Sequence, residues 1–181
     1  NKNTLQSSNL GQYSSGLGVC NRGEGGSRCD SPEHQVDNVG YLDFVLFQFS
    51  MPVDPSLVRI QPYGDNSSST SGNAADRDVR YYINSAELAL TTINGSLPSA
   101  VGSIFNDPST VSSSGRDVTI AGGNIRTLLF GTPSIGSSST STPDSWGDFF
   151  KIHSITVDYV APPGGATDPV PAPGAVVLLG S

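Results

Sequence analysis

The sequence is poor in the residue types that build helical bundles and basic surfaces. Charged residues make up 14% of the chain, and long stretches rich in Glu, Lys and Leu are absent, which excludes an all-helical bundle. Lys and Arg number 9 against 16 Asp and Glu, so the formal net charge is −7. Binding to phosphates or anionic headgroups needs a basic surface, so we expect no nucleic-acid partner and no anionic lipid partner.

Sequence signatures of common enzymes and metal sites are also missing. The chain has no Cys-x-x-Cys pair, Gly-x-Ser-x-Gly elbow, His-Glu-x-x-His motif or P-loop. His34 and His153 are the two histidines, and a hydrolase built on one of them is the third-ranked functional alternative. The apolar run Ala175–Leu179 is far shorter than the roughly 20 residues of a membrane-spanning helix. We therefore expect no enzyme and no membrane span in this chain.

Turn-forming residues are abundant. Gly, Pro and Ser together make up about a third of the chain, a share typical of disordered proteins. However, 35% of the residues are apolar, and they gather in short runs that can build a core. The combination predicts a β-rich domain with many turns and long loops.

Two segments give the strongest strand signals. Residues 41–49 are apolar on both faces of an alternating strand, which is typical of a central strand. Residues 149–160 form the second strand, with Phe149, Ile155, Val157 and Tyr159 expected on one face.

Weaker signals complete the prediction. We expect a turn at Met51–Pro55, a strand at 79–83, and a hairpin between 118–121 and 125–130; residues 85–93 fit either a helix or a strand. The fold class predicted is all-β, an antiparallel β-sandwich of jelly-roll type. Its expected organisation is a polar N-terminal arm or edge strand at 1–16, the sandwich at 17–160, and a Pro/Gly-rich linker with an apolar tail at 161–181.

The two cysteines flank a glycine-rich loop. Eight residues lie between Cys20 and Cys29, a spacing that is not typical of metal-binding cysteine pairs. We predict a disulfide between Cys20 and Cys29, which in turn indicates an oxidising compartment outside the cytoplasm. The alternative is two free thiols in a cytosolic protein. The chain begins at Asn1 without an apolar leader, so we expect any signal peptide to have been removed.

Acidic and amide side chains gather around the same loop. Carboxylates, amides and carbonyls are the ligands that Ca²⁺ prefers, although the spacing here is not that of an EF-hand. The alternative is an acidic loop that is only solvated. The residues expected to bind Ca²⁺ are Glu24, Asp30, Glu33, Asp37, Asn38, Asp43 and Asp158.

Four aromatic residues are candidates for a sugar-stacking platform. A platform would make the domain a Ca²⁺-dependent glycan-binding module. Ordinary packing in the core or at an edge is the alternative, and we favour it. The four residues are Tyr63, Tyr81, Tyr82 and Trp146.

The tail carries a family resemblance. Val170-Pro171-Ala172-Pro173, followed by the apolar run 175–179, resembles the start of a PEP-CTERM sorting segment, in which a Pro-x-Pro motif precedes a hydrophobic helix and an Arg-rich cluster. Ala172 stands where that family usually has Glu, and no Arg cluster follows. The segments 16–19, 34–38, 43–47, 52–53 and 149–155 also resemble a β-sandwich common in these proteins.

The resemblance implies an exported bacterial protein, processed by an exosortase and connected with biofilm or extracellular matrix. We therefore predict a non-catalytic structural protein of the cell surface or extracellular matrix. We expect it to form homo-oligomers or filaments, by addition of a terminal strand to a neighbouring copy. Extracellular polysaccharide is a second expected partner. The alternative function is the Ca²⁺-dependent glycan-binding module.

Overall fold

The computed structural model describes residues 8–20, 35–37, 42–62, 79–87, 115–132, 149–159 and 175–180, the last of these by its backbone. Every regular element among them is a strand, and all pairings are antiparallel. The all-β class is therefore confirmed. The strands are β1 (Asn9–Tyr13), β2 (Gly16–Cys20), β3 (Val36–Asp37), β4 (Phe44–Pro62), β5 (Arg80–Asn84), β6 (Arg116–Thr119), β7 (Ile125–Gly131), β8 (Phe149–Tyr159) and β9 (Ala175–Gly180).

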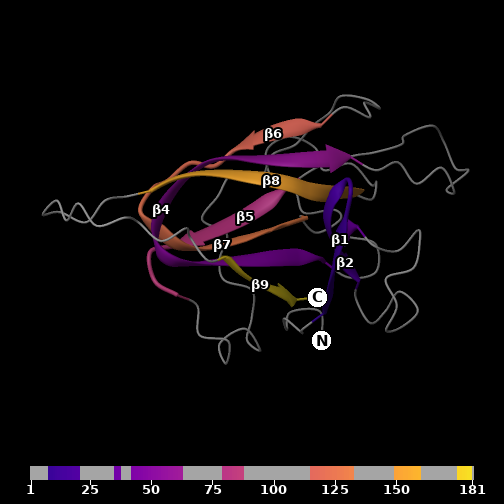
Figure 1. Cartoon of the computed structure of the whole chain (residues 1–181), viewed down its shortest axis with the longest axis horizontal. Coiled ribbons are helices and arrows are strands. Elements are labelled where there is room, and N and C mark those ends of the chain that lie inside the picture. Colours follow the sequence, from indigo (N-terminus) through magenta and orange to yellow (C-terminus); the bar gives the residue numbers. More distant parts are fainter. Residues whose placement is uncertain are drawn as a thin grey trace, which may run out of the picture.

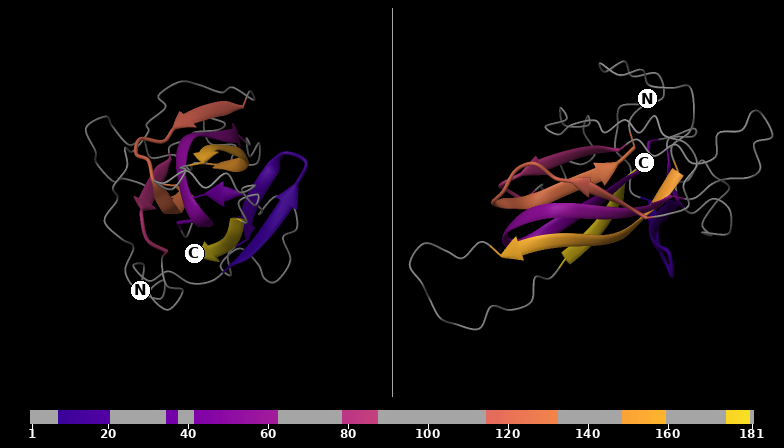
Figure 2. Two further views of the ribbon diagram at one scale, coloured as in Figure 1. Left: turned by 60° about the vertical axis from the view of Figure 1, so that its left-hand side comes forward. Right: turned by 90° about the horizontal axis from the view of Figure 1, so that it is seen from above.

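The 19-residue strand β4 organises the whole sheet. Along one edge it pairs with β7 and then with β6, and along the other edge with β9 and then with β8. Figure 1 shows that β4 turns over at its middle, so that its two halves lie one above the other. The first half lies with β5, β7 and β9, and the second with β6 and β8 (Figures 1 and 2). The strands remain one hydrogen-bonded sheet of nine strands, and the jelly-roll connectivity stays a prediction.

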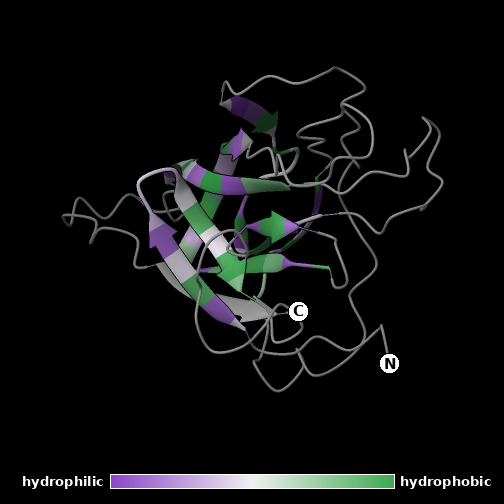
Figure 3. Ribbon diagram, turned by 90° about the vertical axis from the view of Figure 1, so that its right-hand side faces the viewer, coloured by the Kyte–Doolittle hydropathy of each residue, from purple (hydrophilic) through white to green (hydrophobic). Residues whose placement is uncertain are grey.

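The main hydrophobic cluster lies between the two halves. The first half contributes Phe47 from β4 and Phe130 from β7, and the second contributes Phe150 and Ile152 from β8. The rings of Phe130 and Phe150 meet edge to face, with centroids 6.0 Å apart and planes at 74°. In Figure 3 apolar and polar residues alternate along several strands, which is the pattern of a sheet with one face in the core.

A second cluster lies on the opposite face of the first half. Phe44, Leu46 and Leu129 are at most 5% exposed, and Leu42 and Tyr82 pack against them. The first half of β4 is therefore buried on both faces, as its run of apolar residues predicts. This confirms the expectation of a central strand at 41–49.

The turn predicted at Met51–Pro55 is a sharp bend inside one continuous strand and not a loop between two strands. The strand continues through these residues, and Val53, Asp54 and Pro55 all pair with β8. The chain nevertheless doubles back within this strand, so that the two halves of β4 lie one above the other (Figure 1), with a register shift between Gln48 and Val53 on the β7 side. A second shift follows Pro55. Proline lacks an N–H group and is tolerated at such irregular positions.

The predicted hairpin between 118–121 and 125–130 is also wrong. Both strands form, but β6 and β7 pair successively with the same edge of β4 and not with each other. The short connection carries the chain from one half of the sheet to the other. Gly122 and Asn124 have positive φ angles of 120° and 57°, a conformation that Gly and Asn adopt most readily.

The strand at 149–160 is confirmed as β8, and Ile155 and Val157 of the predicted face do pack on the core, but Phe149 does not share their face. Phe150 and Ile152 are the inward residues at its start, and Ile155 and Val157 at its end. The change of parity comes from a register shift, because Arg59 pairs with Ser154 whereas Ile60 pairs with Ile152. A bulge of one residue at His153 moves every later side chain to the other face.

The N-terminal segment forms an edge strand, the second of the two alternatives. β1 pairs with β2 through the two-residue turn at Ser14 and Ser15, closed by the pair Tyr13 and Gly16. The strand predicted at 79–83 is confirmed as β5. Residues 85–87 are irregular, and 88–93 lie outside the described residues.

Candidate functional site

Two of the predicted acidic ligands lie together at one end of the sheet. Asp37 ends β3 and Asp43 precedes β4, and the amide of Asp43 donates a hydrogen bond of 2.9 Å to the carbonyl of Asp37. Thr132, after β7, donates from its amide to Asp43 O at 3.2 Å and from Oγ1 to Asp37 O at 2.8 Å. Asp37, Asp43 and Thr132 are at most 5% exposed. We call these three residues the acidic corner.

A close backbone approach builds this corner. Gly131 pairs with Phe44, and a Cβ atom there would lie 2.1 Å from the carbonyl oxygen of Asp43 and 2.9 Å from Phe44 Cα. Contacts that short do not occur, so only glycine lets β7 pass this close to Asp43. The geometry of the acidic corner thus depends on Gly131, although this residue has no side chain that could bind a ligand.

Asp158 does not belong to this group. Asp37 pairs with Phe149 at the start of β8, and Asp158 pairs with Asp54 near the end of the same strand. The strand rise of about 3.3 Å per residue puts roughly 30 Å between these two positions. Asp158 therefore cannot bind the same metal ion as Asp37 and Asp43.

The acidic corner holds two carboxylates. Among the residues described, no group of three or more His, Cys, Asp or Glu side chains could hold a metal ion. The remaining predicted ligands, Glu24, Asp30, Glu33 and Asn38, lie outside the described residues. Calcium at this corner stays a prediction.

Cys20 is the last residue of β2. Its side chain is 3% exposed, and its carbonyl accepts a hydrogen bond from Ser8 Oγ. Cys29 lies outside the described residues, so the loop that the two cysteines would close stays a prediction.

A buried lysine is a feature that sequence analysis missed. Lys151 on β8 is 2% exposed, and its Nζ lies 4.3 Å from the centroid of the Tyr13 ring. Such a cation over an aromatic face is stabilised by the ring quadrupole. Burial removes water from the ammonium group and so lowers the pKa of Lys151 below its ordinary value. The sequence signal that could have indicated this burial is the position of Lys151 between the apolar residues Phe150 and Ile152.

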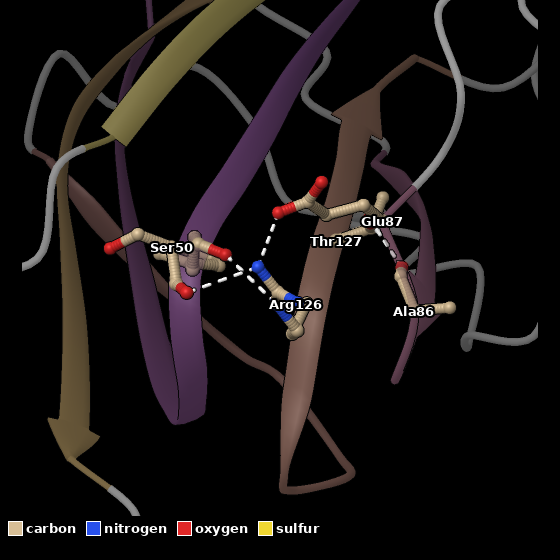
Figure 4. Close-up of polar contacts among 6 residues, drawn as sticks. Ser50, Ala86, Glu87, Arg126 and Thr127 are labelled. Carbon is tan, nitrogen blue, oxygen red and sulfur yellow. Dashed lines mark hydrogen bonds and ion pairs between the residues drawn. The ribbon is translucent and has the colours of Figure 1, made fainter.

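A second missed feature is the arginine that ties the bend of β4 to the end of β5. Arg126 on β7 donates from Nη2 to the carbonyl of Ser50 at 3.0 Å and from Nε to the carbonyl of Phe49 at 3.3 Å. Its Nη2 also forms an ion pair with Glu87 (Figure 4). Next to it, Thr127 Oγ1 donates to the carbonyl of Ala86 at 2.8 Å. These contacts hold three chain segments together where the sheet turns over.

Of the four aromatic candidates, the structure describes Tyr81 and Tyr82, which lie on opposite faces of β5. Tyr81 is 2% exposed in the main cluster and accepts a hydrogen bond from the amide of Ala121, whereas Tyr82 packs on the second cluster. Consecutive residues of a strand point to opposite faces, which separates them. Tyr63 and Trp146 lie outside the described residues.

Of the two candidate histidines, the structure describes His153. His153 is exposed at the bulge of β8. Within the described part of the chain, it makes no hydrogen bond or ion pair with a carboxylate. His34 lies outside the described residues.

The apolar part of the tail is a strand and not the helix that the family resemblance implies. β9 pairs with the first half of β4 over six residues, from Ala175 opposite Phe49 to Gly180 opposite Phe44. Figures 1 and 2 show β9 lying along this half of β4. Val170, Pro171 and Pro173 lie outside the described residues. In the part of the chain described, no helix is long and apolar enough to span a membrane.

Comparisons of the chain with family models, curated proteins and solved structures find no match.

Proposed function

We propose that this chain is an exported, non-catalytic structural protein of the bacterial cell surface or extracellular matrix, which assembles by strand addition. One observation carries the proposal. A segment near the C-terminus, 15 residues beyond the end of β8, forms β9 and adds to an edge of the sheet.

Strand addition needs a sheet edge and a segment that fits it. The edge supplies a row of N–H and C=O groups, and the added segment supplies the complementary row. The ladder between β9 and β4 has this geometry. When the segment comes from another copy, donor and acceptor surfaces differ, so the contact propagates into a filament unless it closes into a ring.

Two further features support export. The disulfide predicted between Cys20 and Cys29 is typical of proteins that fold in oxidising compartments. The resemblance of residues 170–179 to a sorting segment supports a bacterial surface or matrix location. Extracellular polysaccharide is the partner that such a location would supply.

The proposal is tested in the source organism. Antibodies against the chain, applied after cell fractionation and in immunogold electron microscopy, should find it in extracellular or surface material and decorate filaments there. Retention of the chain in the cytoplasm would contradict the proposal. A cytoplasmic marker protein followed in the same fractions controls for cell lysis.

A Ca²⁺-dependent glycan-binding module is the second candidate, favoured by the acidic corner. Asp37 and Asp43 come from separate segments, and their carboxylates lie at a buried site beside Thr132. Buried carboxylates are usually paired or bound to a metal, and Ca²⁺ accepts six to eight oxygen ligands. Isothermal titration of the EDTA-treated chain with Ca²⁺, followed by a glycan array with and without Ca²⁺, tests this function. No heat of Ca²⁺ binding would overturn it.

A further inference from the structure

β9 follows β8 along a single edge of β4. β8 pairs with Val53–Pro62 and β9 with Phe44–Phe49, and both run antiparallel to β4. The last partner of β8 and the first partner of β9 are only four residues apart on β4. At about 3.3 Å per residue, the gap along the edge is roughly 13 Å.

The chain between the two strands is much longer than this gap needs. Fifteen residues lie between Tyr159 and Ala175, and the 16 steps of chain that join these two residues can span up to about 53 Å when extended. An extended connection of about four residues would be enough to continue along the edge. The extra length therefore allows β9 to reach beyond its own sheet, and its entropic penalty is small because loop closure depends only weakly on loop length.

The edge that β9 covers needs an occupant. Val45, Phe47 and Phe49 belong to the main cluster, and Phe44 and Leu46 to the second cluster, all at most 4% exposed. Without a neighbouring strand, backbone groups on this edge would be unpaired beside two apolar clusters. The run from Ala175 to Leu179 is apolar at every position, which is typical of a strand covered on both faces.

We propose that the edge Phe44–Phe49 of β4 is the acceptor site of assembly and that it takes residues Ala175–Gly180 of a second copy in place of its own. The register is that of the structure, with Phe49 opposite Ala175 and Phe44 opposite Gly180. The inference rests on the proposed function and names the donor and acceptor surfaces. Each copy gives its β9 to one neighbour and receives β9 from another.

The competition between the two arrangements depends on concentration. The intramolecular and the exchanged arrangement make the same contacts between β9 and β4. The intramolecular one is therefore favoured only by the effective concentration of the tethered strand, which is on the order of millimolar for short flexible linkers. Exchange therefore becomes important when the local concentration of chains approaches that range. Crowding of exported chains at a surface would meet this condition.

Cysteine cross-linking of full-length chains tests the exchange. Gln48 lies directly opposite Val176, and paired residues of neighbouring antiparallel strands have Cα atoms about 4.5–5.5 Å apart, within disulfide range. Chains carrying Gln48→Cys are mixed with isotope-labelled chains carrying Val176→Cys, oxidised at rising concentration and analysed by non-reducing mass spectrometry. The control is Val177→Cys, whose position is on the opposite face of the strand.

We expect a disulfide-linked heterodimer whose yield rises with concentration and is about tenfold higher with Val176→Cys than with Val177→Cys, because the control pair lacks disulfide geometry. The assembly state of the unmodified chain is measured in parallel by light scattering. If the chain assembles but the two positions give equal yields, this inference is wrong and the proposed function survives. If the chain stays monomeric and a Gln48→Cys, Val176→Cys double variant cross-links only within itself, both fail.

Discussion

The contact between Phe130 and Phe150 gives a quantitative test of how the two halves of the sheet pack. Both side chains are 0% exposed, one in each half, and their rings meet edge to face at 6.0 Å. Replacing either by Leu removes the equivalent of about three buried carbons, or roughly 2 kcal/mol at about 0.8 kcal/mol per methylene. An edge-to-face aromatic pair contributes a further 0.5–1.5 kcal/mol or so.

The double-mutant cycle isolates this contact. Phe130→Leu and Phe150→Leu each remove the whole aromatic pair, so the double variant should lose about 1 kcal/mol less than the sum of the single variants. Each single variant should thus lose roughly 3 kcal/mol and the double variant roughly 5 kcal/mol, which is comparable to the lower end of the 5–15 kcal/mol stability of a typical domain. Urea unfolding followed by circular dichroism measures each free energy of unfolding.

A matched pair controls for general effects on the core. Phe44 is 2% exposed but belongs to the second cluster, on the opposite face of β4. Phe44→Leu and Phe150→Leu should therefore be additive within about 0.5 kcal/mol. A coupling between Phe130 and Phe150 that is no larger than in this control would refute the packing of the two halves against each other.

Three further predictions concern single residues. Burial lowers the pKa of Lys151 in the folded chain below the 10.5 of an ordinary lysine. Between the folded and the unfolded pKa the unfolded chain binds more protons, so the free energy of unfolding should rise with pH toward 10.5. Urea titrations at a series of pH values should show this rise in the unsubstituted chain and not in Lys151→Met. Gly131→Ala should lower the free energy of unfolding by about 1–3 kcal/mol or more, because the new Cβ would clash with the backbone of Asp43. The control Gly115→Ala should be nearly neutral in the same assay, because its Cβ would meet only the ends of side chains, at 3.0–3.1 Å. Added Ca²⁺ should raise the Tm of the EDTA-treated chain by mass action; Asp43→Asn should remove this rise and Asp158→Asn should leave it, and an unchanged Tm in the unsubstituted chain would count against a calcium site.

The central strands could be predicted because their pattern is local. Residues 41–49 and 149–160 carry continuous or alternating apolar side chains, and they became β4 and β8. The extent of β4 could not be predicted in the same way. Pro52 and Pro55 usually mark a turn, and the chain does bend there, but pairing of Val53–Pro55 with β8 continues the strand through the bend with an irregular ladder.

Pairing and parity depend on contacts between distant residues. The two glycines before Asn124 indicate a hairpin between β6 and β7. Both strands pair instead with the same edge of β4, because β4 bends and this edge runs along both halves of the sheet. A single extra residue at His153 reverses the face of everything after it, and no residue type marks such a bulge.

The candidate site was predictable only in part. Asp37 and Asp43 are close in sequence and lie together in the structure, whereas Asp158 was grouped with them without knowledge of the direction of β8. Burial of Lys151 against Tyr13 follows from pairing of the N-terminal hairpin with β8. That pairing has no sequence signal of its own.

The central claim, assembly by strand addition, is tested most directly by multi-angle light scattering of the purified full-length chain over a wide concentration range, with electron microscopy of the most concentrated samples. We predict a mass that grows with concentration beyond that of a dimer and filaments at the upper end. A constant monomer mass up to millimolar concentration, the order at which exchange should compete with the tethered strand, would contradict the account.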